Sequence, residues 1–180
     1  MLQSLVRLEG RIPTKYRFTR RFSRAIIHRF QQKISNFYKG SEVTGLIRQV
    51  RAEVDCQILS NEGYMVYSVA RAQSTMDGVM AEVGTYQGAS AKLICEAKGN
   101  TEFHVFDTFC GLVDASDNDP LFRQSDYSSS ENSVRQYLSQ YPNVHIHKGF
   151  FPAATGDVVR DKKFSFVNLD VDTYASTRDS

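Results

Sequence analysis

The chain has 180 residues, of which 41% are hydrophobic and 12% aromatic, and its formal net charge is +2. This length suits one domain with one core of ordinary size, and no run of 18 apolar residues is present to span a membrane. Three cysteines without Cys-x-x-Cys spacing indicate a reducing compartment. We therefore expect a soluble cytoplasmic protein.

The first part of the chain is strongly basic. Residues 1–40 hold ten Lys or Arg and one acid, whereas residues 41–180 hold 12 basic and 19 acidic residues. Aromatic and apolar residues interleaved with the basic ones predict an amphipathic helix over 18–35. We expect residues 1–60 to form a basic helical extension. It either packs on its own domain as a solvated helix or contacts a partner subunit, as in a homo-oligomer, or an anionic surface.

The elements that follow alternate in type. Helical spacing of apolar residues covers 41–59 and 64–76, and short apolar runs at 79–83, 103–107, 144–147 and 164–169 predict strands. A polar loop covers 114–120, and Ser128 with Glu131 fits a capping box at the start of a further helix. Strand, helix, strand, repeated over residues 61–180, predicts an α/β domain with one parallel sheet and helices on both faces.

The first strand runs into a glycine-punctuated turn. Glu82 ends the strand, Gly84 and Gly88 follow, and Ser90 begins the next helix. Glycines in such a turn let the backbone approach a ligand, and a helix start offers free N–H groups. A tight turn without a ligand would use the same glycines, and Glu82 and Ser90 then serve as capping or turn residues.

An acid ends the second strand, 23 residues after Gly84. Asp107 stands where a nucleotide ligand's two ribose hydroxyls would be held, and Thr108 and Phe109 would then lie against the adenine side. The alternative is that Asp107 caps the following helix.

Two acids follow the last strand. In extended backbone, residues two apart point the same way, so Asp170 and Asp172 are expected to face one crevice at the sheet's carboxyl edge. Carboxylate oxygens suit Mg²⁺, which usually takes one or two of them. The alternative is that Asp172 caps the helix beginning near Thr173.

Four segments carry a family resemblance, in order: Glu82-Val-Gly-Thr-Tyr-Gln-Gly88, Val105-Phe-Asp-Thr-Phe109, Lys148-Gly-Phe-Phe151 and Leu169-Asp-Val-Asp-Thr-Tyr174. Over roughly residues 62–180 the chain resembles the macrocin-type O-methyltransferases, enzymes that use S-adenosylmethionine (SAM) and a divalent metal to methylate sugar hydroxyls.

The resemblance implies a Rossmann-like methyltransferase sheet and a role for each motif residue. Glu82, Gly84, Gly88 and Ser90 would bind the methionine part of SAM. Asp170 would hold Mg²⁺. Asp172 would be the general base that takes the proton from a sugar or other small polyhydroxyl acceptor.

Further strands and a second metal-binding pair of acids that the family has after Asp170 are missing, so we expect this chain to be a fragment whose own activity is in question. The same residues leave two other functions open. A nicotinamide-dependent dehydrogenase shares the sheet and the ribose acid, but the turn lacks Gly-x-Gly-x-x-Gly. A non-catalytic interaction protein would keep the fold while its basic arm carries the function.

Overall fold

The computed structural model describes residue 26 and residues 40–113 and 122–180. The predicted amphipathic helix over 18–35, apart from Ile26, and the predicted polar loop over 114–120 lie outside these residues. None of the helices in the described part combines the length and the apolarity needed to cross a membrane.

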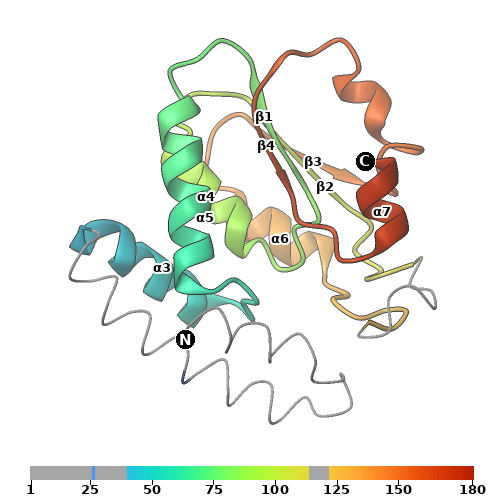
Figure 1. The fold of residues 1–180 in the computed structure, drawn as a ribbon, viewed down its shortest axis with the longest axis horizontal. Coiled ribbons are helices and arrows are strands. Elements are labelled where there is room, and N and C mark those ends of the chain that lie inside the picture. The colour runs from blue at the N-terminus through green and yellow to red at the C-terminus, as the bar shows by residue number, and fades with distance from the viewer. Residues whose placement is uncertain (1–25, 27–39, 114–121) are drawn as a thin grey trace.

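Four parallel strands form one sheet in the order β3-β2-β1-β4 (Figure 1). They are β1 (Val79–Val83), β2 (Phe103–Asp107), β3 (Val144–Lys148) and β4 (Phe164–Leu169). β1 is central and wholly buried, and its Glu82 is in register with Val105 of β2 and Asn168 of β4. The predicted strands and their parallel pairing are confirmed, and the segments after β1, β2 and β4 meet at one edge.

Three α-helices cover one face of the sheet. They are α4 (Ser60–Gln73), α5 (Ala89–Ala97) and α6 (Glu131–Leu138). Ala70, Ile94 and Leu138 from these helices join one core with Met80 and Phe103 of the strands. This cluster is the main hydrophobic core of the described chain.

The other face of the sheet is covered by shorter elements. A 3-10 helix, η2 (Gly156–Val159), places Val159 against Ala81 and Phe106, and Figure 1 shows it with α7 (Tyr174–Asp179) on the side away from α4 and α5. Helices therefore lie on both faces, as predicted, and the whole is a Rossmann-like α/β fold.

Helix α3 (Ser41–Glu53) packs on the domain through Ile47 and Val50, which contact Leu93 of α5. The prediction that this helix continues to residue 59 was wrong: Val54 is extended, with φ −135°, and the chain runs without helix to Ser60. Apolar residues in the linker, such as Ile58, prolong the helical spacing without prolonging the helix.

The predicted start of α6 also differs from the start in the structure. Ser130, not Ser128, is the residue that caps it, because its hydroxyl accepts the Ser133 N–H at 3.3 Å. Glu131, which the capping-box prediction placed three residues into the helix, is its first residue. A run of three serines offers three equivalent caps, so the pattern alone could not choose among them.

A buried lysine joins the end of α5 to the segments that precede β2 and β3. Lys98, 1% exposed, follows α5 and donates through Nζ to the carbonyls of Gly99 at 3.3 Å, Thr101 at 2.9 Å and Pro142 at 2.7 Å. A cation at a helix C-terminus is favoured by the helix dipole. Burial lowers the Lys98 pKa, yet these carbonyls use the three donors of an ammonium group.

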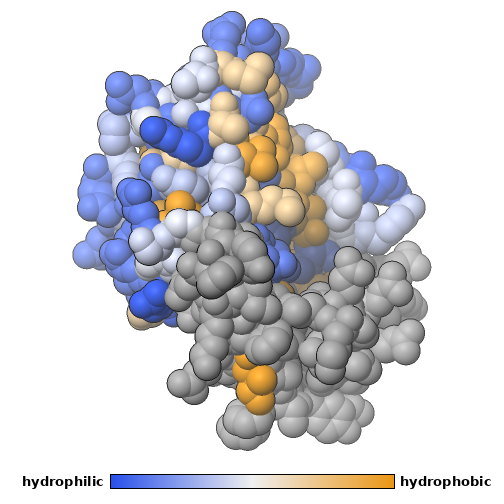
Figure 2. Space-filling model, turned by 60° about the vertical axis from the view of Figure 1, so that its left-hand side comes forward, coloured by the Kyte–Doolittle hydropathy of each residue, from blue (hydrophilic) through white to orange (hydrophobic). Residues whose placement is uncertain are grey.

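Strand β4 lies at the sheet edge and is apolar on both faces. Exposed large apolar side chains gather on this strand, on α4 and in the turn after α4: Met65, Val69, Met76, Phe164, Val167 and Leu169. Figure 2 shows apolar surface in a band among hydrophilic surroundings. In the described chain β4 pairs with β1 alone, so its outer backbone groups have no strand partner.

Candidate functional site

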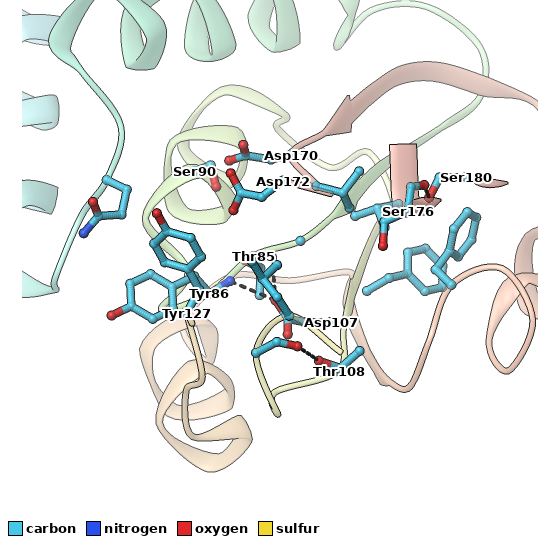
Figure 3. Close-up of a pocket in the computed structure, with 18 of the residues that line it drawn as sticks. Thr85, Tyr86, Ser90, Asp107, Thr108, Tyr127, Asp170, Asp172, Ser176 and Ser180 are labelled. Carbon is cyan, nitrogen blue, oxygen red and sulfur yellow. Dashed lines mark hydrogen bonds between the residues drawn. The ribbon is translucent and has the colours of Figure 1, made fainter. Parts of the chain in front are cut away.

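A cavity of about 300 Å³ opens at the carboxyl edge of the sheet, where the segments after all four strands meet the α3–α4 linker. Six of the residues singled out in the sequence line it (Figure 3): Gly84, Ser90, Asp107, Thr108, Asp170 and Asp172. The other three, Glu82, Gly88 and Phe109, lie behind its wall. A Rossmann-like sheet presents its ligands at this edge.

The Asp107 carboxylate holds the turn after β1 in place. Its Oδ2 accepts the backbone N–H groups of Thr85 at 2.8 Å and Tyr86 at 2.9 Å, and its Oδ1 accepts that of Phe109 at 2.6 Å. Ionised acceptors make stronger hydrogen bonds than neutral ones. Asp107 thus has a structural role that joins the ends of β1 and β2, in addition to its position in the cavity wall.

The two glycines of the turn are explained by contacts within the protein. At Gly84, φ is +86° and an added Cβ would lie 2.2 Å from the Asp170 carbonyl oxygen. Gly88 is the left-handed N-cap of α5, and a Cβ there would lie 3.3 Å from the Tyr137 ring. Gly84 therefore permits the close approach of the chain after β4, which is what brings Asp170 to the cavity.

Glu82 is an unusual buried acid beneath the turn. It is 0% exposed, and burial raises its pKa to about 7, although Ser90, Asn168 and Thr85 lie close enough to oppose the rise. Its Oε1 accepts from Asn168 Nδ2 at 2.9 Å. Among the described residues no donor meets hydrogen-bond geometry at Glu82 Oε2, and none meets it at Thr85 Oγ1. Two buried polar atoms therefore stand beside the cavity without a protein partner.

The side chains of Thr108 and Phe109, which follow β2, lie in different places. The Thr108 hydroxyl donates to the Gly111 carbonyl at 3.0 Å and stays at the cavity wall. Phe109 is 5% exposed, has φ +58° and packs into the main core. Its ring is thus part of the core that supports the wall.

Asp170 and Asp172 both reach the cavity, as the two-residue spacing predicted. Asp170 is open to the cavity but surrounded by protein, which raises its pKa, and the Glu62 carboxylate adds to the rise. Asp172 does not cap α7: Thr173 does, because its hydroxyl accepts the Ser176 N–H at 3.2 Å. No cluster of three or more His, Cys, Asp or Glu side chains that could hold a metal occurs in the described chain.

The α3–α4 linker also contributes to the cavity wall, which was not predicted from the sequence. Asp55 of this linker and Glu62 in the first turn of α4 line the cavity, so five carboxylates line it altogether, and no Lys, Arg or His is among the described lining residues. Tyr86 and Tyr127 complete the same wall. No periodic pattern marks these positions, because the linker and the loop are irregular; the excess of acids after residue 40 was the available signal.

The histidines form a separate cluster on the sheet. His104 Nδ1 lies 3.0 Å from His147 Nε2, and His104 Nε2 lies 3.0 Å from Glu102 Oε1. Burial lowers the His104 pKa to about 4, against the attraction of Glu102. His104 is therefore neutral at pH 7, and the cluster stabilises the β2–β3 pair.

Comparisons with known proteins bear on the fold. No protein-family model matches the chain, and no curated protein matches it by sequence. Among solved structures, the chain is similar to the crystal structure of CalS11, described as a calicheamicin methyltransferase. The TM-score is 0.57 at 14% sequence identity, over 78% of this chain and 72% of that one. At this identity the likeness shows a shared fold.

Proposed function

We propose that the protein is a SAM-dependent methyltransferase. The observation that carries the proposal is the charge of the cavity: five carboxylates and no basic side chain among its described lining residues. SAM has an ammonium and a sulfonium against one carboxylate, and is therefore a net cation. The fold shared with a methyltransferase supports the same proposal.

The arrangement of the acids suits the parts of SAM. Glu62 and the Ser90 hydroxyl offer acceptors for the methionine ammonium at one end of the cavity. Asp107 uses three acceptor positions on backbone N–H groups, and a carboxylate has about four, so a position is left for a ribose hydroxyl. The Thr85 hydroxyl, buried beside Glu82 at the wall, is a further candidate for a ligand contact.

We further propose that the acceptor is a hydroxyl group of a sugar or another small polyhydroxyl compound. Methyl transfer to oxygen breaks the S–CH₃ bond as the O–CH₃ bond forms in line, and the acceptor proton must leave. The protein's main contributions are to align the two reactants and to accept that proton. Asp172 is the proposed base, since it lines the cavity.

A divalent cation fits the described residues in part. Asp170 is the proposed ligand, and Mg²⁺ usually takes one or two carboxylates from a protein and completes its shell with waters. Asp170 shares the cavity with Glu62 and three further carboxylates, and no basic side chain is among the described lining residues, which favours a cation. Such an ion would lower the pKa of the acceptor hydroxyl.

The charge of the cavity also argues against a dehydrogenase, whereas SAM binding and turnover together separate the proposal from a non-catalytic interaction protein. A nicotinamide dinucleotide carries two phosphate charges, which the carboxylates around the cavity would repel. A non-catalytic interaction protein would bind SAM without turnover, or would not bind it. In that case residues 1–60, the proposed basic extension, would carry the function through a partner subunit or an anionic surface.

The proposal is tested by replacing the two acids one at a time and measuring transfer of tritiated methyl from SAM to simple glycosides. Asp172→Asn should reduce turnover about 10²-fold or more with SAM affinity nearly unchanged, because proton removal is lost. Asp170→Asn should raise the Mg²⁺ concentration needed for half-maximal turnover, because an amide holds a hard cation poorly.

The matched control is Asp157→Asn, whose carboxylate is exposed and does not line the cavity. It should leave turnover unchanged. Turnover that survives Asp172→Asn would remove that residue as the base, and turnover insensitive to EDTA would remove the metal from the proposal.

A further inference from the structure

Tyr86 occupies a backbone conformation that glycine favours. Its φ is +52°, and it lies between Gly84 and Gly88, whose φ values are +86° and +85°. A left-handed conformation costs a residue with a Cβ roughly 1–2 kcal/mol. Glycine at position 86 would avoid this strain. Strain at such a position is characteristic of residues whose side chain has a function.

Four contacts fix Tyr86 in this strained position. Its N–H donates to Asp107 at 2.9 Å, and its carbonyl accepts the Ser129 hydroxyl at 2.6 Å. Its own hydroxyl donates to Asp55 Oδ2 at 3.1 Å, across to the α3–α4 linker. Its ring meets the Tyr127 ring edge to face, with centroids 5.6 Å apart at 76°. The side chain is therefore held rigidly where it stands.

Tyr127 shares both the strain and the location. Its φ is +61°, and it lines the same cavity as Tyr86 and Asp55. Figure 3 shows the two rings on one side of the turn after β1 and Ser176 on the other, with Asp172 between them. Two rings at about a right angle thus form an aromatic corner, defined by Tyr86 and Tyr127, on the linker side of the cavity.

Resting on the proposed methyltransferase function, we propose that this aromatic corner is the acceptor subsite and that it takes the ring of a pyranose sugar. The face of an aromatic ring is electronegative and attracts the C–H groups on one face of a pyranose. The Asp55 and Asp172 carboxylates, which line the same cavity from the α3–α4 linker and from the segment after β4, accept hydrogen bonds from its hydroxyls. Such rigid aromatic and acidic groups together select a polyhydroxyl ring over a flat apolar one.

The alternative occupant of the corner is the adenine ring of SAM. The strand order argues against it, because a ligand extended along the edge from Asp170 after β4 to Asp107 after β2 continues toward Phe150 after β3. The corner lies off that line, beside the linker residue Asp55. The corner therefore belongs to the acceptor and not to the cofactor.

The test uses Tyr86→Gly, which suits the backbone conformation and removes the ring. Ser125→Gly is the matched control: Ser125 also has a left-handed φ, +66°, but does not line the cavity. Circular dichroism checks that both variants fold. SAM affinity is measured by calorimetry, and binding of methyl glucoside, mannoside and fucoside by saturation-transfer NMR.

We expect Tyr86→Gly to weaken glycoside binding at least tenfold and to change SAM affinity less than threefold, while Ser125→Gly changes neither. Tyr86→Phe, which keeps the ring and loses the Asp55 bond, should have an intermediate effect. A tenfold loss of SAM affinity in Tyr86→Gly would assign the corner to adenine and overturn the proposal. Unchanged glycoside binding in that variant, or no glycoside binding to the wild type, would overturn it too. Wild-type protein that binds glycosides but not SAM would instead contradict the methyltransferase function.

Discussion

Asp107→Ala should destabilise the protein even when no ligand is present. The change removes an ionised acceptor from three backbone N–H groups, those of Thr85, Tyr86 and Phe109. A hydrogen bond to a charged group contributes about 1.5–3 kcal/mol, and water entering from the cavity replaces part of that. We therefore expect the free energy of unfolding to fall by about 2–4 kcal/mol in urea denaturation, with an unchanged m-value.

The matched control is Asp126→Asn. Asp126 also accepts a backbone N–H through its carboxylate, that of Arg123 at 3.0 Å, but at one exposed contact in a surface loop. Asp126→Asn should lower the free energy of unfolding by under about 1 kcal/mol. If Asp107→Ala loses no more stability than this control, the carboxylate does not hold the turn and our account of the β1–β2 edge is wrong. SAM affinity of the folded variant then measures the ribose contact separately.

Three more predictions concern stability. Lys98→Met should lower the thermal midpoint by several degrees, because three carbonyls lose their shared donor. Gly84→Ala should prevent recovery of folded protein, since its Cβ would meet a carbonyl oxygen at 2.2 Å, whereas Gly99→Ala, with φ +59° and open space around it, should cost about 1 kcal/mol in urea denaturation. Burial lowers the His104 pKa from 6.5 to about 4, so the stability that neutral His104 contributes is present above pH 6.5 and is lost as the pH falls toward 4. His104→Phe should therefore reduce the dependence of the free energy of unfolding on pH in this window.

The predicted strands agree with the structure because each is a short apolar run between clear turn signals. Val79–Val83 is buried at every position, and Gly78 and Gly84 bound it with positive φ. In a parallel sheet, the strand ends alone are enough to bring Asp107 and Asp170 to one edge. The sheet and the edge that carries the cavity could therefore be predicted from local patterns.

The wall opposite the strand ends could not be predicted in the same way. Asp55 reaches the cavity because α3 ends at Glu53. The apolar spacing continues beyond Glu53 and therefore does not indicate where the helix ends. Tyr86 was identified as a departure from a glycine-rich turn, but its direction depends on Asp55 and Tyr127, which are 31 and 41 positions away in the chain. Contacts of this range follow from packing and carry no local sequence signal.

The reasons behind two sequence assignments also changed with the structure. Gly84 was expected to make room for a ligand, and it makes room for the Asp170 carbonyl. Asp107 was expected either to bind ribose or to cap a helix, and its carboxylate has the additional role of holding the β1 turn. Its contact with ribose stays a prediction.

The central claim is that the acidic cavity binds the cationic cofactor SAM. Isothermal titration of the purified chain with SAM and with NAD, in the same low-salt buffer at pH 7.5, tests it most directly. We predict saturable binding of one SAM per chain that weakens as salt is added, since screening reduces the attraction of the carboxylates, and no binding of NAD. Binding of NAD without binding of SAM would contradict the account.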